Sequence, residues 1–219
     1  MQAQPLYCLG DEGRVFVEGL AVAMKRIESV IFDWGGVLID DPGPRRLRYC
    51  ADVLSVPEAG LAEAIAGFMP DFQTGAVNED AFWERVCGEL NVPTPKRRSL
   101  WGDGFAAAYA PRPEMFALAA GLQRQGCRTA LLSNTEAPAV EYFARMGYDM
   151  FDVRVFSCVE GVRKPDLRIY EIAVEKLESP PDRTLYIDDD PKYIGIAKQA
   201  GLNAIIFETI GQVKNALSS

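Results

Sequence analysis

Five mostly apolar runs alternate with amphipathic segments along this chain from residue 28 onward. They are SVIFDW at 29–34, CRTALLSN at 127–134, VRVFSC at 153–158, TLYIDD at 184–189 and NAIIFET at 203–209. Short apolar runs of this kind predict strands that are buried on both faces, and the spacing of apolar residues between them predicts helices. Strands that alternate with helices predict an α/β fold built on a doubly wound parallel sheet.

Residues at the ends of the predicted helices agree with this pattern. Pro113 stands in the first turn of one helix, and Gly126 follows its end. Asp166 is a predicted cap of LRIYEIAVEKLE, and Gly201 follows PKYIGIAKQA. Proline is accepted in a first helical turn, Asp accepts hydrogen bonds from the free N–H groups there, and glycine takes the left-handed conformation that ends many helices. These residues therefore support right-handed strand–helix–strand connections.

The interval from residue 42 to 110 has helical but no strand-like patterning. Apolar residues repeat there at helical spacing in two groups, Leu61, Ile65, Phe68 and Met69, and then Phe82, Val86, Cys87 and Leu90 after a predicted helix cap at Asn78. We therefore expect a small helical-bundle cap domain of about four helices at 42–110. It would lie over an α/β core formed by residues 24–41 and 111–219.

Residues 1–23 join this pattern poorly. Asp11, Glu12 and Glu18 interrupt the region in which a secretory signal would need an apolar stretch. Met24, followed by KRIESVIFDW, would make a natural start. We interpret residues 1–23 as an N-terminal extension of uncertain role or as the product of a misassigned start codon.

Composition and charge exclude several classes of function. The 219 residues are 48% apolar and 25% charged, as in folded globular proteins, and their formal net charge of -8 disfavours a nucleic-acid partner. No apolar stretch approaches the ~20 residues that span a membrane. The chain has no histidine, which excludes an imidazole base and His-ligated zinc.

The five cysteines are widely spread and form no C-x-x-C pair; they are Cys8, Cys50, Cys87, Cys127 and Cys158. This spacing argues against a zinc or redox site. Buried free thiols fit a reducing compartment, and we therefore expect a cytoplasmic protein.

Asp33 ends the first predicted strand and is followed by Gly35 and Gly36. In open α/β sheets, ligands bind beyond the carboxyl ends of the strands, and glycine allows the backbone to approach a ligand closely. A carboxylate in this place can attack phosphorus and form an aspartyl-phosphate. Taken alone, Asp33 fits a turn or cap residue at least as well.

Further groups suited to phosphate stand near the second and third strands. Ser133 and Asn134 end the second strand, ahead of a helix whose first turn we expect to hold Thr135 and Pro138. Hydroxyl, amide and helix N-terminal N–H groups suit phosphate oxygens, although a helix-cap role fits as well. Lys164 precedes a proline, which biases its backbone toward an extended geometry able to aim the ammonium inward, whereas a lone loop lysine is usually solvated.

Asp188, Asp189 and Asp190 follow the fourth strand. Adjacent carboxylates raise each other's pKa unless a cation lies between them. Mg²⁺ is the simplest such cation, because it prefers oxygen ligands and neutralises charge at a phosphoryl group. Capping of the helix that begins at Pro191 accounts for one of the three acids but poorly for all of them.

The four segments IFDWGGVLID, LLSNT, RKPD and YIDDD resemble, in this order, the four motifs of the haloacid dehalogenase (HAD) superfamily. The resemblance runs from about residue 27 to 210 and implies a Rossmann-like HAD core. By position it implies that Asp33 is the nucleophile and that Ser133 and Lys164 hold the phosphoryl group, with Asn134 assisting. It also implies a magnesium site, to which the matching positions contribute Asp33, the backbone carbonyl of Gly35, Asp188 and Asp189.

Within the superfamily, G-V-R-K-P-D-x-x-I-Y at 161–170 and the paired acids most resemble one branch. That branch contains bacterial glucose-1-phosphate phosphatase and the N-terminal phosphatase domain of soluble epoxide hydrolase. Most phosphatases of the family carry a second Asp two residues after the nucleophile, where this chain has Gly35. That Asp serves as general acid and base, so its role falls to water or to a nearby group such as Asp40 or Asp41, and substrates with good leaving groups would suffer least.

Basic and aromatic residues of the predicted cap have two interpretations. Arg45, Arg46 and Arg48, and likewise Lys96, Arg97 and Arg98, are able to steer an anionic substrate, but we favour solvated helix faces. Trp83, Trp101 and Tyr109 are able to stack on a sugar, but their helical spacing favours core packing.

We therefore expect a Mg²⁺-dependent phosphatase that acts on a small phosphorylated metabolite, sugar phosphates included, as a monomer or homodimer. A metal-independent 2-haloacid dehalogenase uses the same Asp attack, but the acids at 188–190 argue against it, since such relatives place Ser and Asn there. A phosphomutase fits less well, because its chemistry depends on the Asp that is missing at position 35. The remaining alternative is a non-catalytic phosphate-binding or interaction protein of the same fold.

Overall fold

The computed structural model describes residues 27–218, so the proposed extension at 1–23 and the start at Met24 lie outside the described residues. Five strands form one sheet in the order β3-β2-β1-β4-β5. They are β1 (Ser29–Phe32), β2 (Arg128–Ser133), β3 (Val153–Phe156), β4 (Thr184–Asp188) and β5 (Asn203–Ile206). All neighbouring pairs are parallel, which confirms the predicted doubly wound sheet.

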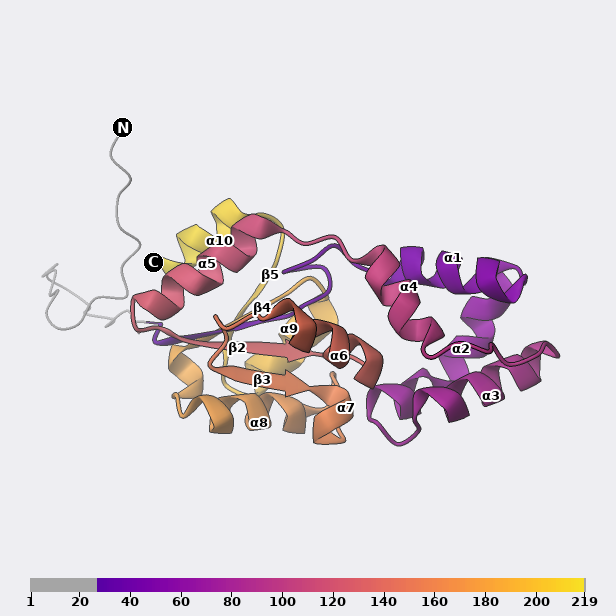
Figure 1. Cartoon of the computed structure of the whole chain (residues 1–219). Coiled ribbons are helices and arrows are strands. Elements are labelled where there is room, and N and C mark those ends of the chain that lie inside the picture. Colours follow the sequence, from indigo (N-terminus) through magenta and orange to yellow (C-terminus); the bar gives the residue numbers. More distant parts are fainter. Residues whose placement is uncertain (1–26, 219) are drawn as a thin grey trace, which may run out of the picture.

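Helices cover both faces of this sheet (Figure 1). Val30 and Phe32 of β1 pack in the cluster that includes α5 (Pro113–Arg124), α6 (Ala137–Met146) and α10 (Ile210–Leu217). Ile31 packs in the opposite cluster with α8 (Leu167–Leu177) and α9 (Pro191–Gln199). Successive strand residues point to opposite faces, so a strand between two helical layers is mainly apolar along its whole length. Two short elements, α7 (Ser157–Glu160) and η1 (Pro181–Arg183), complete the connections.

The residues predicted to mark helix ends do so. Pro113 is the first residue of α5, and Gly126 follows its end with a φ of 84°. The Asp166 side chain accepts a hydrogen bond from the backbone N of Arg168 at the start of α8. Gly201 follows α9 with a φ of 83°, in the left-handed region that glycine tolerates.

Four helices occupy the interval in which a helical cap is expected: α1 (Gly43–Leu54), α2 (Glu58–Gln73), α3 (Glu79–Leu90) and α4 (Leu100–Ala108). Figure 1 shows them beyond the end of the sheet toward which β2 and β3 run. Trp83 and Trp101 are buried in the separate apolar cluster of these helices, in agreement with the core interpretation. Asn78 caps α3 by accepting a hydrogen bond from the backbone N of Ala81 at 2.9 Å. The division of the chain into a core and a cap domain stays a prediction.

Two further expectations concern cysteines and membrane spans. Cys50 and Cys87 are buried free thiols, and Cys158 is a partly exposed one. Cys127 is also buried, and Cys8 lies outside the described residues. None of the described helices has the length and apolar character needed to cross a bilayer.

The sheet places the carboxyl ends of β1, β2 and β4 side by side. The chain fills one side of β1 with β2 and β3 and then returns to the other side for β4 and β5, so the strand order reverses at β1. A crevice forms at such a reversal, because the flanking connections run to opposite faces. Asp33, Ser133 and Asp188 stand at these three strand ends.

Candidate functional site

A pocket of about 190 Å³ opens at these strand ends. Asp33, Gly35, Ser133, Asn134 and Lys164 all line it, so five of the seven residues proposed for the site share one cavity. The remaining two, Asp188 and Asp189, lie beside Asp33, with one carboxylate oxygen of each of the three residues within 4.8 Å of the others. Segments that are far apart in sequence therefore meet in one place because the parallel strands end together.

Lys164 is the centre of the buried charge in this site. Its side chain is 1% exposed, and its Nζ lies 2.9 Å from Asp33 Oδ1 and 2.6 Å from Asp188 Oδ2. The ring of Tyr193 lies beside the same ammonium, 4.7 Å from ring centre to Nζ. A buried ammonium is stable only when anions and ring faces replace its water shell, and the two carboxylates do so here.

Asn134 fixes the loop that carries this lysine. Its Nδ2 donates to the carbonyl oxygen of Lys164 at 2.9 Å, and its Oδ1 accepts from the backbone N of Lys164 at 2.7 Å. Both polar ends of the amide are therefore engaged by one residue. This geometry favours a positioning role for Asn134 over the direct phosphate contact that the sequence suggested.

Asp188 is fully buried at the end of β4, and both of its carboxylate oxygens are occupied. Oδ2 accepts from Lys164 and from the Tyr186 hydroxyl, and Oδ1 accepts from the backbone N of Asp190 at 2.8 Å. Tyr186 was not anticipated from the sequence. Its position two residues before Asp188 on one strand puts both side chains on the same face, which is the signal that could have indicated it.

Burial sets the ionisation of the acidic groups. Burial raises the pKa of Asp33 to about 7; the Lys164 ammonium lowers it in part, and the Asp188 carboxylate raises it again. Burial, with added repulsion from Asp188, also raises the pKa of Asp189. Burial lowers the pKa of Lys164, but the facing Asp33 and Asp188 carboxylates outweigh it and raise that pKa above its usual value. Three carboxylates thus face one fixed ammonium, and negative charge is left over.

The residues present fit a magnesium ion. The cluster of Asp33, Asp188 and Asp189 supplies only oxygen ligands, which Mg²⁺ prefers, and a divalent cation would offset the excess negative charge. Gly36 makes the close approach of Asp189 possible. Its φ is +83°, and a Cβ at this position would lie 2.0 Å from Asp189 Oδ2, so a larger residue would displace that carboxylate.

Two sequence interpretations near these motifs have different outcomes. The expectation that Thr135 lies in the first turn of a helix is wrong, because α6 begins at Ala137 and Glu136 precedes it with an extended backbone. Thr135 instead donates its backbone N to Ser157 Oγ at 2.9 Å. The cap interpretation is correct for Asp190, whose side chain accepts from the backbone N of Lys192 at the start of α9.

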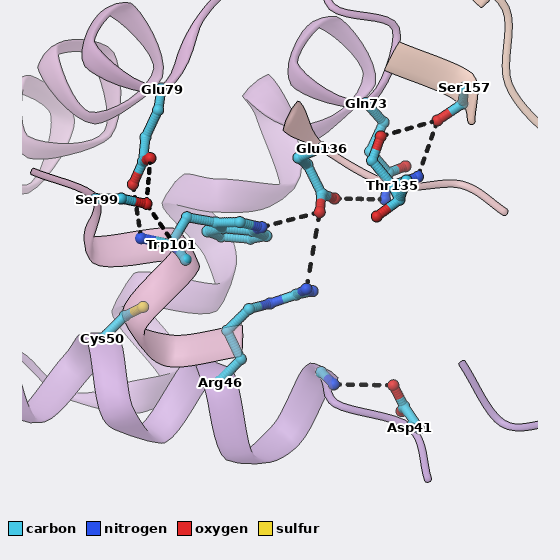
Figure 2. A network of polar contacts seen from close by, with 12 residues as sticks. Asp41, Arg46, Cys50, Gln73, Glu79, Ser99, Trp101, Thr135, Glu136 and Ser157 are labelled. Atoms are coloured by element: carbon cyan, nitrogen blue, oxygen red, sulfur yellow. Dashed lines mark hydrogen bonds and ion pairs between the residues drawn. The ribbon is translucent and has the colours of Figure 1, made fainter. Parts of the chain in front are cut away.

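A polar network at the pocket joins the helices α1, α2 and α4 to Glu136, which lies between β2 and α6 (Figure 2). This buried carboxylate accepts from Gln73 Nε2 at 3.0 Å and from Trp101 Nε1 at 2.9 Å. Arg46 Nη1 lies 3.8 Å from it, and the guanidinium covers the Trp101 ring at 4.1 Å. Arg46, Gln73 and Glu136 also line the pocket. The network was not anticipated, and no sequence signal marks Glu136.

The basic residues of the cap therefore differ in their exposure to solvent. The interpretation of Arg46 as part of a solvated face is wrong, since its side chain is only 15% exposed. Arg48 and Arg97 are exposed as expected, and they pair with Glu58 and Asp103.

Asp40 and Asp41, the two nearby acids considered for proton transfer, have different surroundings. Asp40 Oδ1 accepts from Arg112 Nε at 3.1 Å, and Asp40 does not line the pocket. Asp41 does line it, and its Oδ1 accepts from the backbone N of Gly43 at 2.9 Å.

Comparison with known proteins identifies a family to which the chain belongs and solved structures that share its fold. Residues 27–201 match the model of the haloacid dehalogenase-like hydrolases. The chain is 29% identical over 194 residues to mouse acyl-CoA dehydrogenase family member 10, but the match covers 83% of this chain and only 18% of that protein. It is 26% identical over 178 residues to a sesquiterpene phosphatase of Aspergillus oryzae, covering 80% of this chain and 87% of that protein.

Among solved structures, the chain resembles a HAD family enzyme of Bacteroides thetaiotaomicron in complex with magnesium and inorganic phosphate. The TM-score is 0.72 at 18% sequence identity, and the superposition covers 85% of this chain and 98% of that one. At this identity the likeness concerns the fold, and it agrees with the five-stranded parallel sheet described above.

Proposed function

Because the chain belongs to the haloacid dehalogenase-like hydrolase family, we propose that it is a Mg²⁺-dependent phosphatase that forms an aspartyl-phosphate at Asp33. The substrate would be a small phosphorylated metabolite. The observation that supports this most strongly is the meeting of Asp33, Asp188 and Asp189 within 4.8 Å, next to the buried ammonium of Lys164.

Each residue of the site has a task in this proposal. Asp33 attacks phosphorus, and Lys164, already 2.9 Å from Asp33 Oδ1, holds a phosphoryl oxygen and offsets the charge of the nucleophile. Ser133 lies in the same pocket and offers its hydroxyl to a second phosphoryl oxygen. Asn134 keeps Lys164 in place through its two hydrogen bonds to the Lys164 backbone.

Asp33, the carbonyl of Gly35, Asp188 and Asp189 would hold Mg²⁺. The ion would supply positive charge that keeps Asp33 ionised and that stabilises the negative charge of the phosphoryl group. Because burial raises the pKa of Asp33 and a protonated carboxyl is not a nucleophile, this charge would increase the fraction of Asp33 able to attack.

The contacts of Glu136 support a cap that bounds the leaving-group side of the pocket. Arg46 and Gln73 come from α1 and α2 and line the same cavity as Asp33, so we expect them to contact the part of the substrate beyond the phosphoryl group. The name of the Aspergillus relative suggests an apolar alcohol as one class of leaving group. The polar pocket lining in this chain supports a hydroxylated one.

A panel of sugar, nucleotide, alkyl and aryl phosphates, each assayed with Mg²⁺ and with chelator, tests this proposal. We expect turnover that stops on chelation, returns with added Mg²⁺ and is abolished in Asp33→Asn. Asp52→Asn is a matched control, because this exposed carboxylate of α1 does not line the pocket, and it should keep wild-type rates. Activity that is independent of metal, or that survives in Asp33→Asn, would contradict the proposal.

The same protein distinguishes the alternatives. Chloride release from 2-chloropropionate without metal would indicate a dehalogenase. The two acids beside Asp33 disfavour this activity, since that reaction has no cation to balance their charge. Tight binding of phosphate and Mg²⁺ without turnover of any ester would indicate a phosphate-binding protein.

A further inference from the structure

Proton transfer in the proposed reaction lacks an assigned residue, since position 35 carries glycine. The ionisable side chains that line the pocket are few, and the sequence has no histidine. They are Asp33, Asp41, Arg46, Glu136, Lys164 and Tyr193. Asp33 is the proposed nucleophile, so the proton must be carried by one of the other five or by water.

Three of these five are unsuited to exchange a proton near neutral pH. An arginine guanidinium such as that of Arg46 does not lose its proton in proteins. Lys164 keeps its proton, because its buried ammonium forms ion pairs with both Asp33 and Asp188, at 2.9 and 2.6 Å. Burial raises the pKa of Tyr193 above its usual value, so its phenol is neither a base nor a ready acid.

Glu136 is held by hydrogen-bond donors at both of its carboxylate oxygens. Its Oε1 accepts from Gln73 at 3.0 Å, and its Oε2 accepts from Trp101 at 2.9 Å with Arg46 nearby at 3.8 Å. Its side chain is 2% exposed. Three donors from three helices hold this carboxylate as a structural anion.

Asp41 differs from Glu136 in each of these respects. It is exposed, and its one hydrogen bond among the described residues is from the backbone N of Gly43 to Oδ1, which leaves Oδ2 without a partner there. Figure 2 shows its side chain apart from the Arg46–Glu136 network, joined only to the start of α1.

Asp41 also lies in the chain segment that passes beside Gly35. A Cβ built at Gly35 would lie 3.4 Å from Cδ of Pro42, the residue that follows Asp41. Asp41 itself lines the pocket together with Asp33 and Gly35. The segment thus brings a carboxylate to the side of the pocket from which a side chain at position 35 would project.

We propose that Asp41 is the proton-transfer residue of this enzyme, in the place left vacant by Gly35; the proposal rests on the phosphatase function proposed above. In the first step, Asp33 forms a bond to phosphorus, the bond from phosphorus to the leaving oxygen breaks, and that oxygen takes the proton of the Asp41 carboxyl. In the second step, the Asp41 carboxylate takes a proton from water as the water oxygen bonds to phosphorus. The bond from Asp33 to phosphorus then breaks, and inorganic phosphate and protonated Asp41 are restored.

The test compares Asp41→Asn with Asp40→Asn on phosphate esters of graded leaving-group basicity. Asp40 is the matched control, because it is the adjacent acid and pairs with Arg112 outside the pocket. General acid catalysis contributes about 10²- to 10⁴-fold, so kcat/KM of Asp41→Asn should fall about 10²-fold or more on alkyl phosphates. It should fall little on p-nitrophenyl phosphate, whose leaving phenolate needs no proton. On that substrate, Asp41→Asn should also release a burst of nitrophenolate equal to the enzyme concentration, because the second step still lacks its base.

Three results would overturn the assignment. The first is an equal loss of kcat/KM in Asp41→Asn on alkyl and aryl esters. The second is a loss in Asp40→Asn as large as that in Asp41→Asn. The third is the absence of a nitrophenolate burst in Asp41→Asn together with wild-type turnover of alkyl phosphates. A wild-type enzyme that hydrolyses no ester in the panel would overturn the phosphatase proposal itself, and the role of Asp41 with it.

Discussion

Replacement of Lys164 by methionine should destabilise the protein strongly, because it removes the ammonium that lies between two buried carboxylates. Lys164 is 1% exposed, and its partners Asp33 and Asp188 are 9% and 0% exposed, at 2.9 and 2.6 Å from Nζ. Water therefore screens these ion pairs very little. Breaking a buried pair by removal of one partner costs about 3–5 kcal/mol, and we expect Lys164→Met to lose about this much free energy of unfolding near pH 8.

The loss of unfolding free energy in Lys164→Met should be smaller at pH 5 than at pH 8, because the ionisation of Asp33 differs between these pH values. Burial already raises the pKa of Asp33 to about 7, and Lys164 is the group that most lowers it, so Lys164→Met should raise it further. A carboxyl whose pKa is higher in the folded than in the unfolded state stabilises the fold while it is protonated, and this stability is lost as pH rises through the folded pKa. At pH 5 the variant therefore keeps a neutral Asp33, whereas at pH 8 it must bury a charge or bind a proton at a cost.

Urea unfolding of wild type and Lys164→Met at pH 5 and pH 8, in chelator, measures both effects. Chelator is required, because a bound cation would take the place of the missing ammonium. Lys176→Met is the control: the pair of Lys176 with Glu160 has the lysine side chain 44% exposed, so its loss should cost at most about 1 kcal/mol. A loss below about 1 kcal/mol in Lys164→Met at pH 8, or equal losses at the two pH values, would refute the reasoning.

Two other substitutions test the geometry of the site. Gly36→Ala places a Cβ 2.0 Å from Asp189 Oδ2 at a φ of +83°. The Mg²⁺ concentration for half-maximal activity should therefore rise at least about tenfold. Gly67→Ala in α2 is the control and should not change this concentration, because a Cβ there meets no neighbouring atom within 4 Å. An unchanged Mg²⁺ dependence in Gly36→Ala would exclude Asp189 as a ligand. Glu136→Ala leaves the Trp101 and Gln73 donors without their acceptor and should cost about 1–3 kcal/mol in thermal or urea unfolding while raising KM. Wild-type stability and KM in this variant would show that the network does not hold the helices over the pocket.

The features of this protein that are predictable from sequence are strand burial, helix caps and the meeting of residues at strand ends. Val30, Ile31 and Phe32 of β1 are all apolar because helices cover both faces of the sheet. Asn78 and Asp166 mark helix starts because free N–H groups need acceptors. The order of the strand-end motifs predicts the meeting of Asp33 and Asp188, since parallel strands end at one edge.

Side-chain partners across separate elements are not predictable in this way. Apolar periodicity indicates that a residue is buried, but not which residue it faces. Arg46 and Glu136 meet only because α1 packs against α4 and α4 packs against α6, whose first residue follows Glu136. Their sequence neighbours give no sign of it. Asn134 carries the donor and acceptor that suit a phosphate, yet the loop at Lys164 uses both. The exact start of α6 is not predictable either, because the first residue of a helix depends on local backbone conformation. Thr135 therefore lies outside the helix, two residues before its start at Ala137.

The covalent state of Asp33 during turnover tests the proposed reaction most directly. Wild-type protein is mixed with Mg²⁺ and a hydrolysed phosphate ester, quenched in acid and mapped by peptide mass spectrometry. We expect one phosphoryl group on the peptide that contains Asp33, its absence when Mg²⁺ is chelated, and its accumulation in Asp41→Asn, where the second step is slowed. Steady turnover with no phosphoryl group on Asp33, or with one on another residue, would contradict the proposed mechanism.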